Sequence, residues 1–244
     1  SAAFEAADAN ANGREVLVSA GVYYLGNHVT IENQIRFEGT VTMPADKRFV
    51  FQKNFDYATY VDAFGDEELA FKKAFQALLN FSDHESLDLC GRRIAVSAPI
   101  DMQAAEGSKT VFAIRRVIRN GQFQPVDGPV WDPTVVTTSA SYASTDPLRL
   151  TNVVNVGQIA IGSLVTGFGV GREIYVRAVD TVANTVTLSQ ELYGAAASQS
   201  YTFTRFKYLL DFSGFDDLAQ FVIDDVEFLC NGEASGIMLA KEGL

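Results

Sequence analysis

The residues best suited to chemistry are six acids near the C-terminal end of the chain. They are Asp211, Asp216, Asp217, Asp224, Asp225 and Glu227. Enzymes that cleave polysaccharides use a pair of carboxylates across a groove, or calcium-bound Asp side chains together with a basic Arg or Lys. Asp225 and Glu227 are two residues apart in a strand pattern, so we expect them on one face. The alternative is that all six are ordinary solvent-facing acids.

Basic partners for these acids are scarce. Between Tyr208 and Leu244 the only basic residue is Lys241. A lyase mechanism would therefore need Arg115, Arg116 or Arg119 to approach from an earlier part of the chain. The sequence has no spaced calcium-binding loop. We accordingly predict no catalytic, cofactor-binding or metal-binding residue.

Histidine and glycine motifs add no catalytic signal. His28 and His84 lack ligand-type neighbours at metal-binding spacing, and His84 lies in a polar turn (residues 82–86) where we expect it to face solvent. The stretch Gly167–Gly171 looks like a phosphate-binding loop. It leads into another strand pattern, however, so no helix N-terminus would be present to hold an anion.

The chain has two cysteines, Cys90 and Cys230, each at the end of an apolar strand pattern. Two thiols do not make a disulfide framework, and free cysteines are commonly buried. We expect both to be buried structural thiols, which leaves the cellular compartment open.

Exposed aromatic side chains could stack on sugar rings. The candidates are Trp131, Tyr142, Tyr175 and Tyr193. They lie in or beside a segment that we expect to project from the rest of the fold, although core or interface packing is the alternative for each.

Composition narrows the choice of partners. The chain is 48% hydrophobic and 20% charged, as expected of a globular protein, and its net charge is −11. That charge disfavours nucleic acid and anionic membranes, and no apolar run is long enough for membrane insertion. From Tyr208 to Leu244 eight acids face one lysine, a net charge of −7, whereas residues 134–205 carry four acids and four arginines.

Two stretches repeat one arrangement, a short helix followed by short strands. The first has a helix over Ala2–Gly13 and strands up to Val41, followed by a link over Thr42–Asp62. The second has a helix over Gly65–Asn80, N-capped by Asp66, and then strands over Leu87–Cys90, Ile94–Ser97 and Thr110–Arg119.

The second helix has an apolar stripe of Leu69, Phe71, Phe75, Leu78 and Leu79. Its polar residues Lys72, Lys73 and Gln76 are expected to face solvent. Such a helix would cover the open end of a coil of stacked strands.

A composition change marks a separate segment. Residues 122–133 contain three prolines and predict a linker, with turns expected at Gly91-Arg92 and Asn120-Gly121 before it. Residues 134–206 predict a small all-β insert of five or six strands, with a hairpin turn at Ala183-Asn184. The strand pattern then resumes over residues 207–244. We expect the natural protein to start upstream of Ser1, and either partners or further residues to cover the C-terminal end.

The order of these motifs resembles the opening segment of pectate-lyase-like right-handed parallel β-helices. The resemblance rests on Val16, Val18, Gly21, Tyr23 and Leu25, and on the Gly65-Asp66 pair that often opens such domains. Residues 134–206 look like a small β module of phage tail and fibre proteins. The resemblance implies a mainly β fold, a right-handed parallel β-helix with short capping helices and a small all-β insert.

The expected segments are a first β-helix opening segment (1–62), a second capping helix with rungs (63–133), the insert (134–206) and further rungs (207–244). The resemblance implies a spike or fibre component of a phage or gene transfer agent, located at the particle surface and extracellular when released. Its expected partners are copies of itself, usually as a trimer, other particle proteins and host cell-surface polysaccharide. Two alternatives remain, a polysaccharide depolymerase acting in a β-helix groove and a secreted carbohydrate-binding module.

Overall fold

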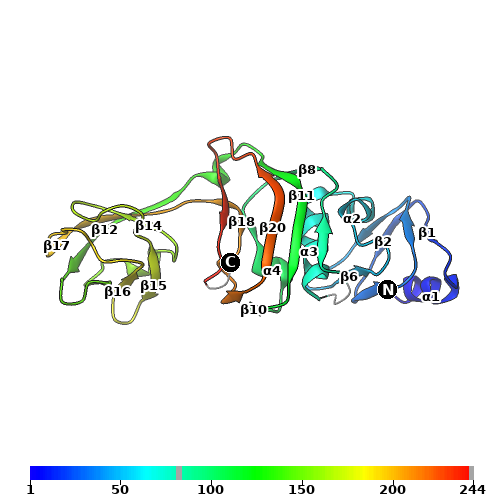
Figure 1. The fold of residues 1–244 in the computed structure, drawn as a ribbon, viewed down its shortest axis with the longest axis horizontal. Coiled ribbons are helices and arrows are strands. Elements are labelled where there is room, and N and C mark those ends of the chain that lie inside the picture. Colours follow the sequence, from blue (N-terminus) through cyan, green and yellow to red (C-terminus); the bar gives the residue numbers. More distant parts are fainter. Residues whose placement is uncertain (81–83, 242–244) are drawn as a thin grey trace. The chain divides into compact units, whose positions relative to one another are not determined.

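The computed structural model describes residues 1–80 and 84–241 (Figure 1). The chain forms two compact units, one made of Ser1–Asp127 with Tyr208–Leu244 and the other of Gly128–Lys207. The fold is mainly β, with α-helices packed among short parallel strands in the first unit and an antiparallel six-stranded sheet in the second. The expectation of a mainly β chain that contains a small all-β segment is confirmed at this level.

Residues 16–51 form a stack of short parallel strands, which we call the first coil. It has six strands, and they pair two by two. They are β1 (Val16–Val18), β2 (Val22–Tyr24), β3 (Val29–Ile31), β4 (Ile35–Phe37), β5 (Thr40–Thr42) and β6 (Phe49–Phe51). β1 pairs with β4, β2 with β5 and β3 with β6, all in parallel, so the second three strands stack on the first three. Helix α1 (Ala2–Ala11) contacts β1 and β3 and buries Phe4. This helix therefore covers the first three strands.

The segment Thr42–Asp62 is more than the link that we expected. It contains strand β6, all three residues of which are buried, and the start of helix α2 (Tyr57–Phe64). Asp56 caps this helix by accepting a hydrogen bond from the Thr59 amide at 2.9 Å. Both elements are short, and β6 lacks the alternation that marks a half-buried strand.

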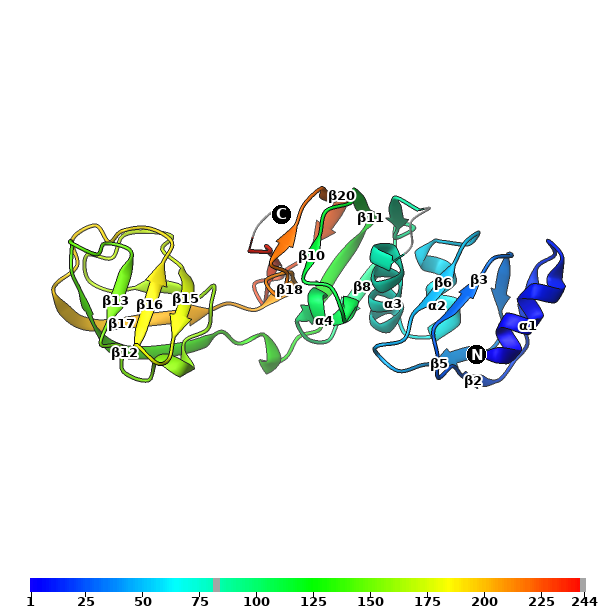
Figure 2. The ribbon, with the colours of Figure 1, turned by 90° about the horizontal axis from the view of Figure 1, so that it is seen from below.

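Helix α3 (Glu67–Asn80) begins as expected at Asp66, whose Oδ1 accepts a hydrogen bond from the Leu69 amide at 2.7 Å. The expected solvent-facing side is wrong, because Lys73 and Gln76 are buried. The helix contacts β6 of the first coil on one side and strands β7 and β8, described next, on the other (Figure 2). It lies between two sets of strands, so its polar side also faces protein.

The second coil repeats the stacking of parallel strands. Its elements are β7 (Ser86–Asp88), β8 (Arg93–Val96), β9 (Ile100–Asp101), α4 (Met102–Glu106), β10 (Val111–Phe112), β11 (Arg116–Pro125), β18 (Tyr208–Asp211), β19 (Asp217–Leu218), β20 (Phe221–Phe228) and β21 (Ser235–Met238). β11 pairs with β7 and β8 on one side and with β20 on the other, and β18 lies between β9 and β21. β10 pairs with β19. Successive passes of the chain thus stack in parallel.

Strand β11 corrects two expectations. It continues through Asn120-Gly121, where we expected a turn, and to Pro125, inside the segment that we expected to be a linker. Asn120 and Asp225 both have left-handed backbone conformations, with φ of 60° and 50°. The residues on either side of them are register partners, so Asn120 lies opposite Asp225 in the paired strands. The two strands therefore bend together and remain paired.

The second unit is an antiparallel sheet in the order β14-β17-β12-β13-β16-β15. Its strands are β12 (Thr134–Tyr142), β13 (Arg149–Thr151), β14 (Leu164–Thr166), β15 (Val176–Asp180), β16 (Thr185–Leu188) and β17 (Ser198–Arg205), with short 3-10 turns η1 (Pro129–Trp131) and η2 (Val156–Gln158). The expected hairpin at Ala183-Asn184 is confirmed, since β15 and β16 pair on either side of it. The unit has its own core, which includes Leu150, Val186, Tyr201 and Phe203.

No helix in the described part of the chain is both long and apolar enough to cross a membrane.

Candidate functional site

The six acids are spread over several elements. Asp211 Oδ1 accepts hydrogen bonds from the amide and hydroxyl of Ser213 at 2.9 and 2.6 Å. Asp216 pairs with Lys241, 2.6 Å from Nζ to Oδ1, and Asp217 is half-buried in β19. Glu242, counted among the acids of this region, lies outside the described residues. Asp211 and Asp216 thus act in local turn and surface contacts, and Asp217 lies in a different strand from Asp225 and Glu227.

Asp225 and Glu227 both line one hollow, together with residues of β11 and of the turn at Gly91. The hollow has a volume of about 480 Å³, and its other lining residues are Gly91, Asn120, Gly121, Gln122 and Val226. Glu227 accepts a hydrogen bond from Gln122 Nε2 at 2.6 Å, and Gln122 Oε1 accepts one from Arg93 Nε at 3.1 Å. The side chains of β8, β11 and β20 thus form a hydrogen-bonded row across the strands.

Of the three arginines that could serve these acids, one approaches them. Arg119 is the register partner of Asp224, and its guanidinium pairs with Asp88 at 3.2 Å. Arg115 pairs with Glu85. Arg116 is buried, and its Nε donates to the Leu78 carbonyl at 2.8 Å. Arg115 and Arg116 therefore have structural partners away from the acids.

The histidines take part in packing and local hydrogen bonds. Nδ1 of His28 accepts a hydrogen bond from the Arg48 amide at 3.0 Å, and partial desolvation of the ring together with the charge of Arg48 lowers its pKa. His84 is half-buried, stacks on Phe55 with ring centroids 5.0 Å apart and lies 2.7 Å from the Gln52 carbonyl. The expectation that His84 faces solvent is therefore wrong, and Ser82 and Asp83 of its turn lie outside the described residues. Among the residues that the structure describes, no group of three His, Cys, Asp or Glu side chains could hold a metal ion.

The cysteines are less buried than we expected. Cys90 is exposed and Cys230 half-buried. Cys90 has φ 57°, and its amide donates to Asp88 Oδ1 at 2.8 Å. Leu87 and Leu89 are buried and alternate with Asp88 and Cys90, so Cys90 occupies an outward-facing position at this left-handed turn.

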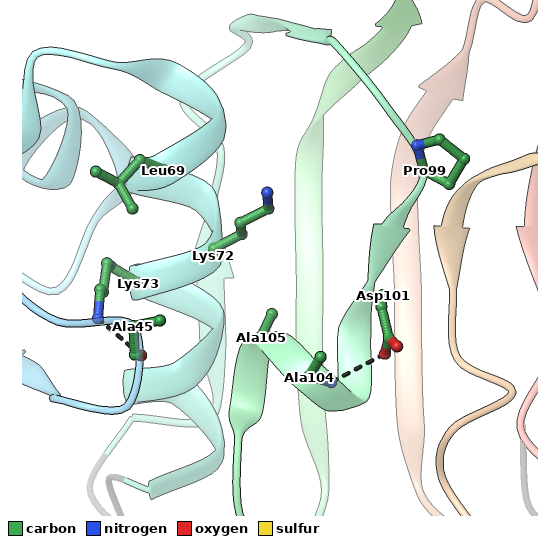
Figure 3. Close-up of a pocket in the computed structure, with 8 residues that line it drawn as sticks. All are labelled: Ala45, Leu69, Lys72, Lys73, Pro99, Asp101, Ala104 and Ala105. Atoms are coloured by element: carbon green, nitrogen blue, oxygen red, sulfur yellow. Dashed lines mark hydrogen bonds between the residues drawn. The ribbon is translucent and has the colours of Figure 1, made fainter. Parts of the chain in front are cut away.

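A second hollow, of about 310 Å³, lies between α3 and α4 (Figure 3). Its two ammonium groups are already used. Lys73 Nζ donates to the carbonyls of Pro44 and Ala45 at 2.8 and 3.0 Å and to that of Lys47 at 2.6 Å. Lys72 pairs with Glu68 at 2.6 Å.

The remaining charged group in this hollow, Asp101, caps α4 by accepting from the Ala104 amide at 2.9 Å (Figure 3). Burial lowers the pKa of Lys73 to about 8, against a smaller opposing effect of Asp46. Each charged side chain that lines this hollow already has a protein partner, so the hollow presents no unpaired charged group for chemistry.

The aromatic candidates of the second unit divide into buried and exposed residues. Trp131 is buried, which rules out the stacking role considered for it, and Tyr142 is half-buried with its hydroxyl accepting from the Leu192 amide at 3.3 Å. Tyr175 is 36% exposed and Tyr193 is 92% exposed. Phe168, which we did not consider, is 82% exposed. Its sequence signal is a phenylalanine between two glycines at the end of a strand.

Phe168 and Tyr193 lie on two loop segments that run side by side. We call these segments, 167–171 and 192–195, the aromatic loops. The Gly194 amide donates to the Gly169 carbonyl at 2.7 Å, and the Tyr193 amide donates to the Val170 carbonyl at 3.3 Å. As expected, 167–171 leads to strand β15 and not to a helix. The loops therefore present aromatic rings and no anion-binding helix end.

Comparisons of the chain with protein-family models, with curated proteins and with solved structures found no match. The function proposed below accordingly rests on the residues and geometry of this chain.

Proposed function

We propose that the chain is a structural component of a spike or fibre on a phage or gene transfer agent particle, and that it attaches the particle to polysaccharide of the host cell surface. The observation that carries this proposal is the stacking of short parallel strands, pass upon pass, in both coils of the first unit. The proposal places the protein at the particle surface, extracellular when the particle is released.

Within this proposal the coils are right-handed parallel β-helices of the pectate-lyase-like kind. Three features support that assignment. The first is the parallel pairing of strands that belong to successive passes of the chain, such as β7 with β11 and β11 with β20. The second is the in-register bend at Asn120 and Asp225. The third is helix α1 over the first three strands, because a coil of strands needs its open end covered.

The proposal includes a homo-oligomer, with three copies as the expected number. The support is the outermost pass of the second coil. In the described part of the chain β20 pairs only with β11, and β21 only with β18. Apolar residues of this pass, among them Val226 and Ile237, remain half-exposed. Unpaired strand edges of this kind are normally covered by another chain or segment.

The test is to locate the protein in its assembly. Antibodies against the purified chain should bind projections on intact particles in electron micrographs, and the protein should co-purify with particles through a density gradient. Native mass measurement should give three times the chain mass. Recovery of the protein only from particle-free fractions, as a monomer, would contradict the proposal.

A second candidate function, polysaccharide cleavage, has one observation in its favour. Asp225 and Glu227 both line the hollow across β11 and β20, and glycoside hydrolases use two carboxylates. If this candidate is correct, the Asp225→Asn/Glu227→Gln variant should lose the release of new reducing ends from host polysaccharide. The Asp216→Asn variant, altered outside the hollow, is the matched control. The favoured function predicts no release by any of the three proteins.

A further inference from the structure

We propose that Phe168 and Tyr193 form a paired aromatic contact site for the pyranose rings of a surface polysaccharide. This inference rests on the proposed function and deepens it, since it assigns the glycan contact to the two aromatic loops of the second unit. The class of ligand is a chain of six-membered sugar rings whose apolar C–H faces lie against the aromatic faces.

The side chains of Phe168 and Tyr193 are largely exposed to solvent. Phe168 is 82% exposed and Tyr193 is 92% exposed. Neighbouring apolar residues on the same loops do pack inward, since Val170 is 1% and Leu192 is 6% exposed. The loops thus bury their aliphatic side chains in the core and leave the two aromatic rings outside. Burying a phenylalanine side chain stabilises a fold, so leaving these two rings exposed forgoes stability that the core would otherwise gain.

The loops are also held in place by their own hydrogen bonds. Phe168 makes two hydrogen bonds with the side chain of Gln199. The Phe168 amide donates to Gln199 Oε1 at 3.1 Å, and Gln199 Nε2 donates to the Phe168 carbonyl at 2.8 Å. Gly169 lies so close to the carbonyl of Gly194 that a Cβ there would overlap it. Because a fixed backbone limits the entropy lost on binding, these rings are suited to recognition.

The surroundings favour a sugar over a protein partner. The other exposed residues of the aromatic loops, and of the turn that follows residue 171, are small or charged, namely Gly167, Gly171, Arg172, Glu173 and Gly194. Two rings set among such residues do not form the broad apolar centre of a protein interface. A pyranose fits better, because its C–H face can lie against an aromatic face while its hydroxyl groups hydrogen-bond to polar and charged groups of the adjoining turn.

Charge supports the same assignment. Residues 128–207 carry five acids and five basic residues, so the whole net charge of −11 belongs to the rest of the chain. Many cell-surface polysaccharides are anionic, and like charges repel. The neutral unit is therefore the part of the protein best able to approach them.

The test uses the full chain and an array of bacterial surface oligosaccharides built from neutral and acidic pyranoses. The Phe168→Ala/Tyr193→Ala variant should bind its glycan about tenfold more weakly than the wild type, or worse. The Phe168→Tyr/Tyr193→Phe variant keeps both rings and should bind as the wild type does. The Val182→Ala variant is the matched control, because Val182 is 92% exposed on another turn of the same unit. Unchanged thermal unfolding of each variant checks that the fold is retained.

The outcomes separate the inference from the proposed function. If the wild type binds a glycan and the double alanine variant binds it equally well, the contact site is wrong and the proposed attachment stands. If the wild type binds no glycan on the array, the proposed attachment and the contact site both fail. If binding to host cells survives periodate oxidation of their glycans but not protease treatment, the partner is a protein and the inference is overturned.

Discussion

Buried polar side chains of the first unit are used to join segments that are far apart in the sequence. Lys73 satisfies three carbonyls of the loop before β6, and Gln76 Nε2 donates to the Ala45 and Glu106 carbonyls at 3.1 and 3.3 Å. A buried polar group left without a partner costs about 1–3 kcal/mol, so these contacts of the two buried side chains matter to the fold. The polar residues of α3 thus act as internal connectors.

Asp8 gives a residue-scale prediction. This buried carboxylate accepts hydrogen bonds from the Glu32 amide at 2.8 Å and from the Asn33 amide and Nδ2 at 3.0 and 2.9 Å. Burial acts to raise its pKa, but these hydrogen bonds outweigh that effect and the pKa is lowered from 3.8. Because the folded pKa is the lower one, the carboxylate stabilises the fold fully above about pH 4, the unfolded value, and that contribution is lost as the pH falls through the folded value.

The Asp8→Asn variant should therefore lose about 1–3 kcal/mol of unfolding free energy at pH 7, measured by urea denaturation, and much less at pH 2. The Glu5→Gln variant changes an exposed acid on the same helix and should behave as the wild type. An equal loss at both pH values would contradict the role assigned to the ionised carboxylate.

At the scale of elements, hydrophobic periodicity predicted where many strands and helices form. Strands β1, β3 and β8 have the alternating burial that their sequences indicate. The Asp66 cap and the apolar stripe of α3 also occur where expected, except that Leu69 is partly exposed. Helix α4 was missed because its five residues are too few to show a helical period.

The close approach of the two aromatic loops at Gly169 and Gly194 gives a prediction about stability at this scale. Gly169 has φ +67°, and an added Cβ would overlap the Gly194 carbonyl, whereas an added Cβ at Gly194 would meet no atom within 4 Å. The Gly169→Ala variant should therefore lose roughly 1–3 kcal/mol of stability through backbone strain. The Gly194→Ala variant should stay close to the wild type, with both measured by thermal unfolding. Equal stability of the two variants would show that Gly169 does not approach the Gly194 carbonyl so closely.

The whole molecule is divided into two units with separate cores, and each should unfold on its own. The core around Leu150, Val186 and Tyr201 belongs entirely to residues 128–207. Separate cores joined by few segments unfold in separate steps.

Calorimetry should therefore show two transitions. The Gly169→Ala substitution is expected to lower only one of them and Asp8→Asn only the other, because the two sites lie in separate units. A single transition shifted by both substitutions would show instead that the units unfold together.

Local structure was readable from the sequence because its causes are local. The Asp66 cap, the hairpin turn at Ala183-Asn184 and the alternating strands each depend on residues within a few positions of one another. Only the tertiary structure shows which strands pair, for example β11 with β20, which residues 128–207 separate in the sequence. Only the tertiary structure shows that Lys73 is buried against the loop before β6. It also decided that Phe168 and Tyr193 lie on adjoining exposed loops. These features depend on contacts between distant segments, which no short window of residues contains.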